Sequence, residues 1–113
     1  MKTIKDKILM SELEEMAEKM FGNLVKAVVD VEKQIMAVDG ELHADLQALL
    51  IESGSGWQNL WGINLRPGKQ GEDFVEFDSV INIRPTQNNR SRGVENAGIR
   101  EKIIKIVNKL VQK

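Results

Sequence analysis

The chain has 113 residues, of which 42% are hydrophobic and 29% are charged, with a formal net charge of −1 and no cysteine. This length fits one domain, residues 1–113, that can bury a core of its own. The absence of cysteine excludes disulfides and cysteine-based catalysis or zinc binding, and no run approaches the ~20 apolar residues of a membrane span. We therefore expect a cytoplasmic protein with no membrane partner.

The charges are distributed unevenly along the chain. Residues 1–57 carry six Lys against eleven Asp and Glu, a charge of −5, whereas residues 58–113 carry five Lys and five Arg against six Asp and Glu, a charge of +4. Two such halves can pair within one fold, pair between protomers of a homo-oligomer, or present a basic face to an anionic small molecule or RNA.

The first predicted element is a helix that begins at Ser11 and stops at Gly22. Ser11 and Glu14 match a capping box, in which each side chain bonds a free backbone N–H at the helix start. Glycine ends helices because it adopts the left-handed conformation without a side-chain clash. Between them the apolar residues recur at helical spacing: Leu13, Met16, Ala17, Met20 and Phe21.

A β-hairpin and a second helix follow. Residues 24–31 and 35–38 are two apolar runs, rich in β-branched residues in the first, with three polar residues between them, which favours a hairpin. Residues 41–52 place leucines on one helical stripe, and the Ser-Gly-Ser-Gly sequence at 53–56 stops that helix.

The second half of the chain is also predicted to contain a hairpin followed by a helix. Residues 60–66 and 74–84 alternate apolar and polar side chains at the period of a strand, and the turn-forming residues 67–73 connect them. Pro85 ends the second strand because it has no N–H to donate. Asn96 is the predicted N-cap of a last helix with inward apolar residues: Ile99, Ile103, Ile106, Val107 and Leu110.

The predicted fold is therefore an α+β domain in the order α-ββ-α-ββ-α. We expect two hairpins to form a mainly antiparallel four-stranded sheet, with the three helices covering one face.

Four residue runs resemble, taken together, a family of small uncharacterised prokaryotic proteins, classed as a domain of unknown function. They are ELHAD at 41–45, LWGIN at 60–64, EFDSVINIRP at 76–85 and NRSRGVE at 89–95. The resemblance extends from about Leu24 to Leu110. Family members tend to have an acidic residue in place of Asn59, and Asp-Pro in place of Asn96-Ala97. The resemblance implies no activity, cofactor or catalytic residue.

Three of the five arginines, Arg84, Arg90 and Arg92, surround one polar segment before the last helix. Guanidinium groups bind phosphate or carboxylate at two points, and a helix start favours an anion at the same place. The predicted ligand-binding residues are Asn82, Arg84, Gln87, Asn88, Arg90, Ser91 and Arg92. The leading hypothesis is thus a small binding domain for a nucleotide, an RNA phosphate or another phosphate or carboxylate group.

The same arginines can instead pair with Glu76, Asp78 or the acidic first helix and only hold the loop in place. Glu95 also adjoins the segment and would repel a phosphate unless it turns away. The second hypothesis is a homo-oligomeric interaction protein without a small ligand.

His43 is the only histidine, and the third hypothesis is a hydrolase that uses it with a carboxylate, either Asp39 or Asp78. Asp45 lies ~160° around the helix from His43, so these two are poor partners. A lone histidine beside an apolar face is, however, more often structural. The spacing of Asp39, Asp45 and Asp78 matches no metal-binding loop, and no cofactor motif is present, so we predict neither a metal site nor a cofactor.

Overall fold

A computed structural model describes residues 1–113 and confirms an α+β fold with three helices. The helices are α1 (Met10–Lys19), α2 (His43–Glu52) and α3 (Ala97–Leu110). The strands are β1 (Lys2–Ile4), β2 (Ile8–Leu9), β3 (Val25–Asp30), β4 (Ile35–Val38), β5 (Leu60–Leu65), β6 (Val75–Glu76) and β7 (Val111–Gln112).

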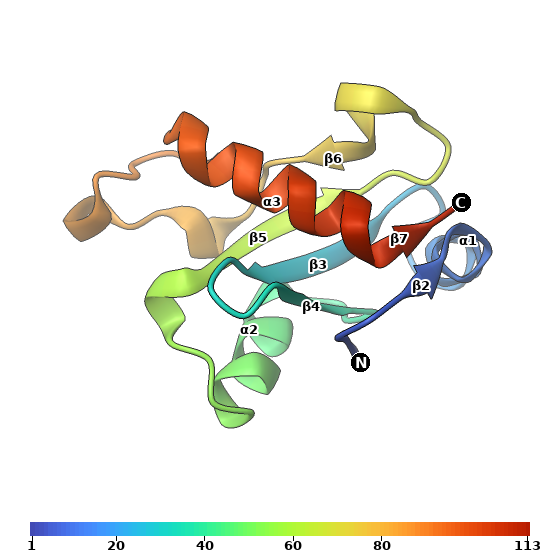
Figure 1. Cartoon of the computed structure of the whole chain (residues 1–113), viewed down its shortest axis with the longest axis horizontal. Helices are drawn as coiled ribbons and strands as arrows, with labels where there is room; N and C mark the ends of the chain where they lie inside the picture. The colour runs from blue at the N-terminus through green and yellow to red at the C-terminus, as the bar shows by residue number, and fades with distance from the viewer.

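The main sheet is antiparallel and has five strands in the order β1-β4-β3-β5-β6, so the predicted four-stranded sheet was wrong by one strand. The extra strand, β1, pairs with the edge of β4 through only three residues, too short a run to be recognised from alternation. A separate parallel pair, β2 and β7, joins the two ends of the chain beside α1 (Figure 1).

Helices cover both faces of the sheet, and the prediction that they cover one face was wrong. Figure 1 shows α3 lying across one face, with α2 on the other. Val25, Ala27 and Val29 of β3 belong to the larger core cluster, under α1 and α3, whereas Val28 packs against Leu46 and Leu50 of α2. A strand that is apolar on both sides is typical of a sheet with helices on both faces.

The predicted hairpin at 24–38 is confirmed as β3 and β4, and its turn depends on Asp30. This carboxylate is fully buried and accepts hydrogen bonds from the N–H groups of Glu32 and Lys33, both at 2.9 Å. The hydroxyl of Ser55 also donates to it, at 2.6 Å, and so connects the end of α2 to the turn.

Two helix starts differ from their predictions and one agrees. α1 begins at Met10, with the N–H of Leu9 donating to the Glu12 carboxylate at 2.9 Å, so the predicted Ser11 and Glu14 capping box was wrong. α2 begins at His43 instead of residue 41. Asn96 caps α3 as predicted, because its side chain accepts from the N–H of Ile99 at 3.0 Å.

Candidate functional site

The predicted second strand of the last hairpin, residues 74–84, is mostly not a strand. Only Val75 and Glu76 pair with β5, and the chain then forms short 3₁₀ turns at Val80–Asn82 and Pro85–Gln87. The alternating pattern of residues 77–84 therefore misled the strand prediction. Arg84, the second of these turns and the following loop make up the arginine segment, residues 84–95.

The side chain of Asn82 takes the place of a paired strand beside β5. Asn82 is completely buried, its oxygen accepts from the N–H of Gly62 at 2.8 Å, and its amide donates to the carbonyl of Gly62 at 2.9 Å. The same amide also donates to the Arg92 carbonyl at 2.9 Å. Asn82 was predicted to bind a ligand, but its hydrogen bonds to the sheet leave it no free donor or acceptor on this side.

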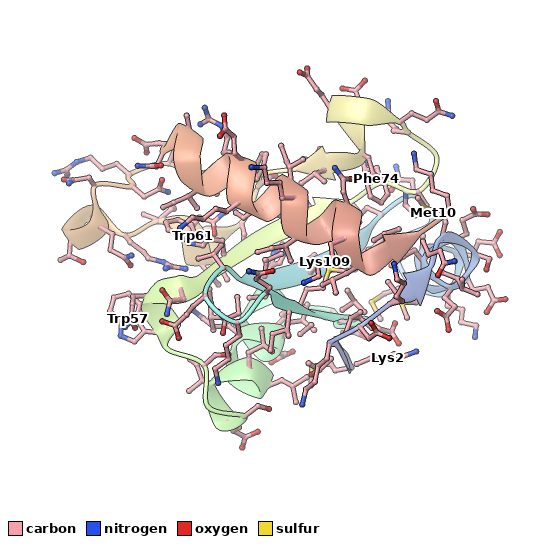
Figure 2. The ribbon with its side chains drawn as sticks, in the orientation of Figure 1. Lys2, Met10, Trp57, Trp61, Phe74 and Lys109 are labelled. Atoms are coloured by element: carbon pink, nitrogen blue, oxygen red, sulfur yellow. The ribbon has the colours of Figure 1, made fainter.

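Arg84 is also directed into the protein, with 6% of its surface exposed. Its guanidinium lies over the ring of Trp61, 4.3 Å from the ring centre, and Figure 2 shows Trp57 and Trp61 at this end of β5. Its donors bind four backbone carbonyls, those of Trp57, Gln58, Leu60 and Ile81. Burial lowers the pKa of Arg84, and no carboxylate accompanies it. The structure therefore places Arg84 in the scaffold, apart from Arg90 and Arg92.

The loop that follows is organised by Asn89, which the sequence analysis missed. Its buried amide donates to the carbonyls of Asn82 at 2.7 Å and Gly93 at 2.8 Å, and its oxygen accepts from the N–H of Glu95 at 2.8 Å. The predicted neighbour, Asn88, is exposed and takes the left-handed conformation that ends the preceding turn. Asparagine is typical of turns, but its type does not tell which of two adjacent ones faces inward.

Gln87 contributes to the scaffold as well. Its amide donates to the carbonyl of Gln58 at 3.2 Å, and its oxygen accepts from Arg84 at 3.3 Å. The segment is therefore attached to the start of β5 by two of its predicted ligand residues.

In the loop formed by residues 90–95, two backbone N–H groups converge on a carboxylate of the same loop. The backbone N–H groups of Arg90 and Ser91 both donate to one oxygen of Glu95, at 2.7 and 2.9 Å. These hydrogen bonds lower the pKa of Glu95, whose side chain is exposed. Arg90 is exposed and its guanidinium makes no ion pair. Glu95 was expected to repel a phosphate unless it turned away, and in the structure its carboxylate is turned toward the loop, onto the N–H groups of Arg90 and Ser91.

Arg92 belongs to the same loop, and its side chain is exposed and pairs with Asp78, with 2.5 Å between Nε and Oδ1. About half of each side chain remains accessible, so the pair can exchange with solvent or a ligand.

His43 lies at the start of α2 with its Nε2 atom 2.7 Å from the carbonyl oxygen of Ile63. Because a carbonyl only accepts hydrogen bonds, Nε2 carries the proton and Nδ1 keeps a free lone pair. Burial is the main cause that lowers the pKa of His43, and the charges of Lys26, Asp78 and Arg92 are close enough to act on it. No hydrogen bond joins Asp39 to His43, and Asp39 itself takes a left-handed conformation after β4.

Three strands place a polar row beside His43 that the sequence analysis did not predict. Lys26, Asn64 and Glu76 are direct neighbours in register across β3, β5 and β6. The Asn64 amide donates to Glu76 at 2.8 Å, and Arg66 forms an ion pair with Glu76 at 3.0 Å. The other end of the Asn64 side chain, Oδ1, is buried without a hydrogen-bond partner.

A cleft of about 1030 Å³ lies elsewhere, between the start of α1, the loop 67–74 and the end of α3. Figure 2 shows Met10 and Phe74, which line it, at the opposite end of the molecule from Trp57. The cleft contains none of the predicted site residues. No three His, Asp or Glu side chains are arranged to hold a metal ion, and no helix is long and apolar enough to cross a membrane.

These features define a small α+β domain whose polar residues gather on one loop and one sheet face. The chain belongs to the family described as Protein of unknown function (DUF5674), whose model matches residues 2–110. This confirms the resemblance to a family of unknown function and extends it to the first strand. No curated protein and no solved structure matches the chain.

Proposed function

We propose that this protein is a binding domain for a small anionic group, phosphate or carboxylate, held by the loop from Arg90 to Glu95. The observation that carries the proposal is the convergence of the Arg90 and Ser91 N–H groups on one oxygen of Glu95. Successive backbone N–H groups in a turn form a concave site for anions. Glu95 then occupies the position of the ligand.

The backbone of the loop is held in a conformation that can accept an anion once the Glu95 side chain moves away. Asn89, just before the loop, donates to the carbonyl of Gly93 and accepts from the N–H of Glu95, and its amide also donates to Asn82. Asn82 in turn donates to the Arg92 carbonyl. A binding group that is already ordered loses less entropy on binding. The guanidinium of Arg90 is exposed and its charge acts on Glu95, so it can supply the charge-assisted bonds that phosphate and carboxylate favour. Arg92 can add to them when it leaves Asp78.

Glu95 competes with any external anion because it is tethered to the site. A side chain on a short tether acts as a ligand at an effective concentration of about millimolar or higher. We therefore expect weak binding by the wild-type protein and tighter binding once the Glu95 carboxylate is removed. This direction is opposite to that of an ordinary binding residue, whose removal weakens affinity.

The experiment compares Glu95→Ala with Glu101→Ala, a matched control on the exposed side of α3. Amide NMR titrations use inorganic phosphate, acetate, AMP and a short single-stranded RNA, which distinguish a free anion from a nucleotide or nucleic acid. We expect E95A to bind about tenfold more tightly than wild type, a gain of ~1.4 kcal/mol, and E101A to match wild type. Shifts should centre on the amides of Arg90 and Ser91, and Arg90→Ala should weaken binding.

The salt dependence adds a second readout, since binding that neutralises phosphates weakens steeply as salt rises. If neither wild type nor E95A shows shifts at Arg90 and Ser91 with any of these anions, the proposal is wrong. It also fails if E95A and E101A bind equally.

A further inference from the structure

A second group of polar residues lies on the α2 face of the sheet. Its residues are distant in sequence from the Arg90–Glu95 loop. In β5, Trp61, Ile63 and Leu65 face the large core under α3, so Gly62 and Asn64 face the α2 side. His43 is held against this strand through its bond to the carbonyl of Ile63, the residue before Asn64. His43, at the start of α2, and the Asn64 side chain therefore lie on the same face of the sheet.

Both residues present an acceptor with no donor. The Nε2–H of His43 is used by Ile63, so its Nδ1 lone pair has no partner. The amide of Asn64 is used by Glu76, and its Oδ1 atom is the only buried side-chain polar atom in the protein without a hydrogen bond. Asn64 is 6% exposed, and an unpaired acceptor at such depth destabilises a fold. Less than 1 Å² of Oδ1 is accessible, so a donor from outside the chain reaches it when a neighbouring side chain moves aside.

The surrounding charges indicate what else such a ligand carries. Glu76 is already neutralised by Arg66, and Asp78 is paired with Arg92. The ammonium of Lys26, the cross-strand neighbour of Asn64, has no carboxylate partner and lies 4.9 Å from the ring centre of Phe21. Two acceptors next to an unpaired cation match a ligand with a hydrogen-bond donor beside a negative charge.

We propose that His43 and Asn64 recognise the hydroxyl group of a small hydroxylated anion, a hydroxy acid or a sugar phosphate, with Lys26 facing its anionic group. In this arrangement the hydroxyl hydrogen or a bound water bridges to the two acceptors. The three residues proposed to contact the ligand come from β3, α2 and β5, and none of them belongs to the Arg90–Glu95 loop.

The test uses pairs of compounds that differ in one hydroxyl group. Lactate is compared with propionate, and glycerol 3-phosphate with propyl phosphate, each titrated to about 50 mM to detect dissociation constants in the millimolar range. His43 is the only histidine, so its imidazole ¹⁵N signals report on this site without assignment ambiguity. We expect the hydroxylated member of a pair to shift the Nδ1 signal and to bind about tenfold more tightly, since a site with a buried acceptor discriminates against a compound that leaves it unpaired.

Asn64→Ala should abolish the preference for the hydroxylated compound, whereas Asn108→Ala, a matched exposed control on α3, should retain it. Thermal unfolding of both variants checks that they fold, and the paired compounds test the wild-type protein however Asn64→Ala behaves. The proposal is overturned if no compound shifts the imidazole signals, or if both members of each pair bind equally. Shifts confined to the amides of residues 90–95 would support only the proposed anion loop and would overturn the His43 and Asn64 site.

Discussion

Replacing Arg84 by methionine tests whether the arginine segment is divided into a scaffold and a site. Methionine keeps a long flexible side chain but removes every donor that now reaches the backbone. The two shortest of these bonds, to the carbonyls of Ile81 and Leu60, lie at the buried end of the group. Hydrogen bonds to charged groups contribute about 1.5–3 kcal/mol each, so losing these two should cost about 3 kcal/mol. We discount the longer bonds to Trp57 and Gln58, since bonds from one guanidinium are not additive.

The assay is urea denaturation, in which the free energy of unfolding falls linearly with denaturant concentration. A loss of about 3 kcal/mol is a large part of the 5–15 kcal/mol that stabilises a typical domain and corresponds to roughly 12 °C or more in Tm. Arg84→Lys keeps the charge but not the planar set of donors, so it should lose more than half as much. Arg90→Met is the matched control, and its exposed side chain should change stability by less than about 0.5 kcal/mol.

The scaffold role of Arg84 is refuted if the free energy of unfolding of Arg84→Met lies within about 1 kcal/mol of that of wild type, with an unchanged dependence on urea concentration. Arg84 would then be free to bind a ligand, and loss of anion binding at unchanged stability would place it in the site with Arg90 and Arg92.

Three further changes have defined outcomes. Gly62→Ala places a Cβ atom 2.6 Å from the Cβ and Oγ atoms of Ser79 and should destabilise by about 1–3 kcal/mol in urea denaturation; recovery in the Gly62→Ala/Ser79→Gly double variant would attribute the loss to this clash. Asn89→Ala leaves buried backbone groups unpaired, so hydrogen exchange of the amides in residues 89–95 should accelerate more than in α3, and uniform protection would contradict this. The lowered pKa of His43 means that the native state binds fewer protons than the unfolded state just below pH 6.5; stability is therefore complete above pH 6.5 and declines as the pH falls from there to the native-state pKa. Unfolding curves of wild type and His43→Gln should diverge in this window, and parallel curves would show that His43 is not buried in its neutral form.

Several elements could be predicted because neighbouring residues alone determine them. Asn96 forms the α3 cap with an N–H three residues ahead, and Gly22 takes the left-handed conformation after α1. The hairpin of β3 and β4 needs only two apolar runs and a short turn. These interactions depend on local spacing, which any fold containing them would preserve.

The strand predicted over residues 77–84 and the role predicted for Arg84 were wrong for the same reason. In residues 77–84 the side chains alternate as in a strand, but Asn82 bonds the backbone of Gly62, twenty residues away, and releases the chain from the sheet. Arg84 was predicted to bind a ligand together with Arg90 and Arg92, yet its guanidinium binds the carbonyls of Ile81 and Leu60 inside the protein. Neither partner can be inferred from spacing, because the contacts join segments that are distant in sequence.

The amino-acid sequence by itself determined the class of fold, the three helices, the first hairpin and the concentration of arginines before α3. Local propensity and apolar periodicity act over a few residues, and these features need nothing more. Only the tertiary structure decided which polar groups face inward, which arginines of the segment remain exposed, and that the Glu95 carboxylate accepts hydrogen bonds from the N–H groups of its own loop. It also left Oδ1 of Asn64 without a donor, because the strands on either side of a residue, and not its neighbours in the chain, determine the partners of a side chain in a sheet.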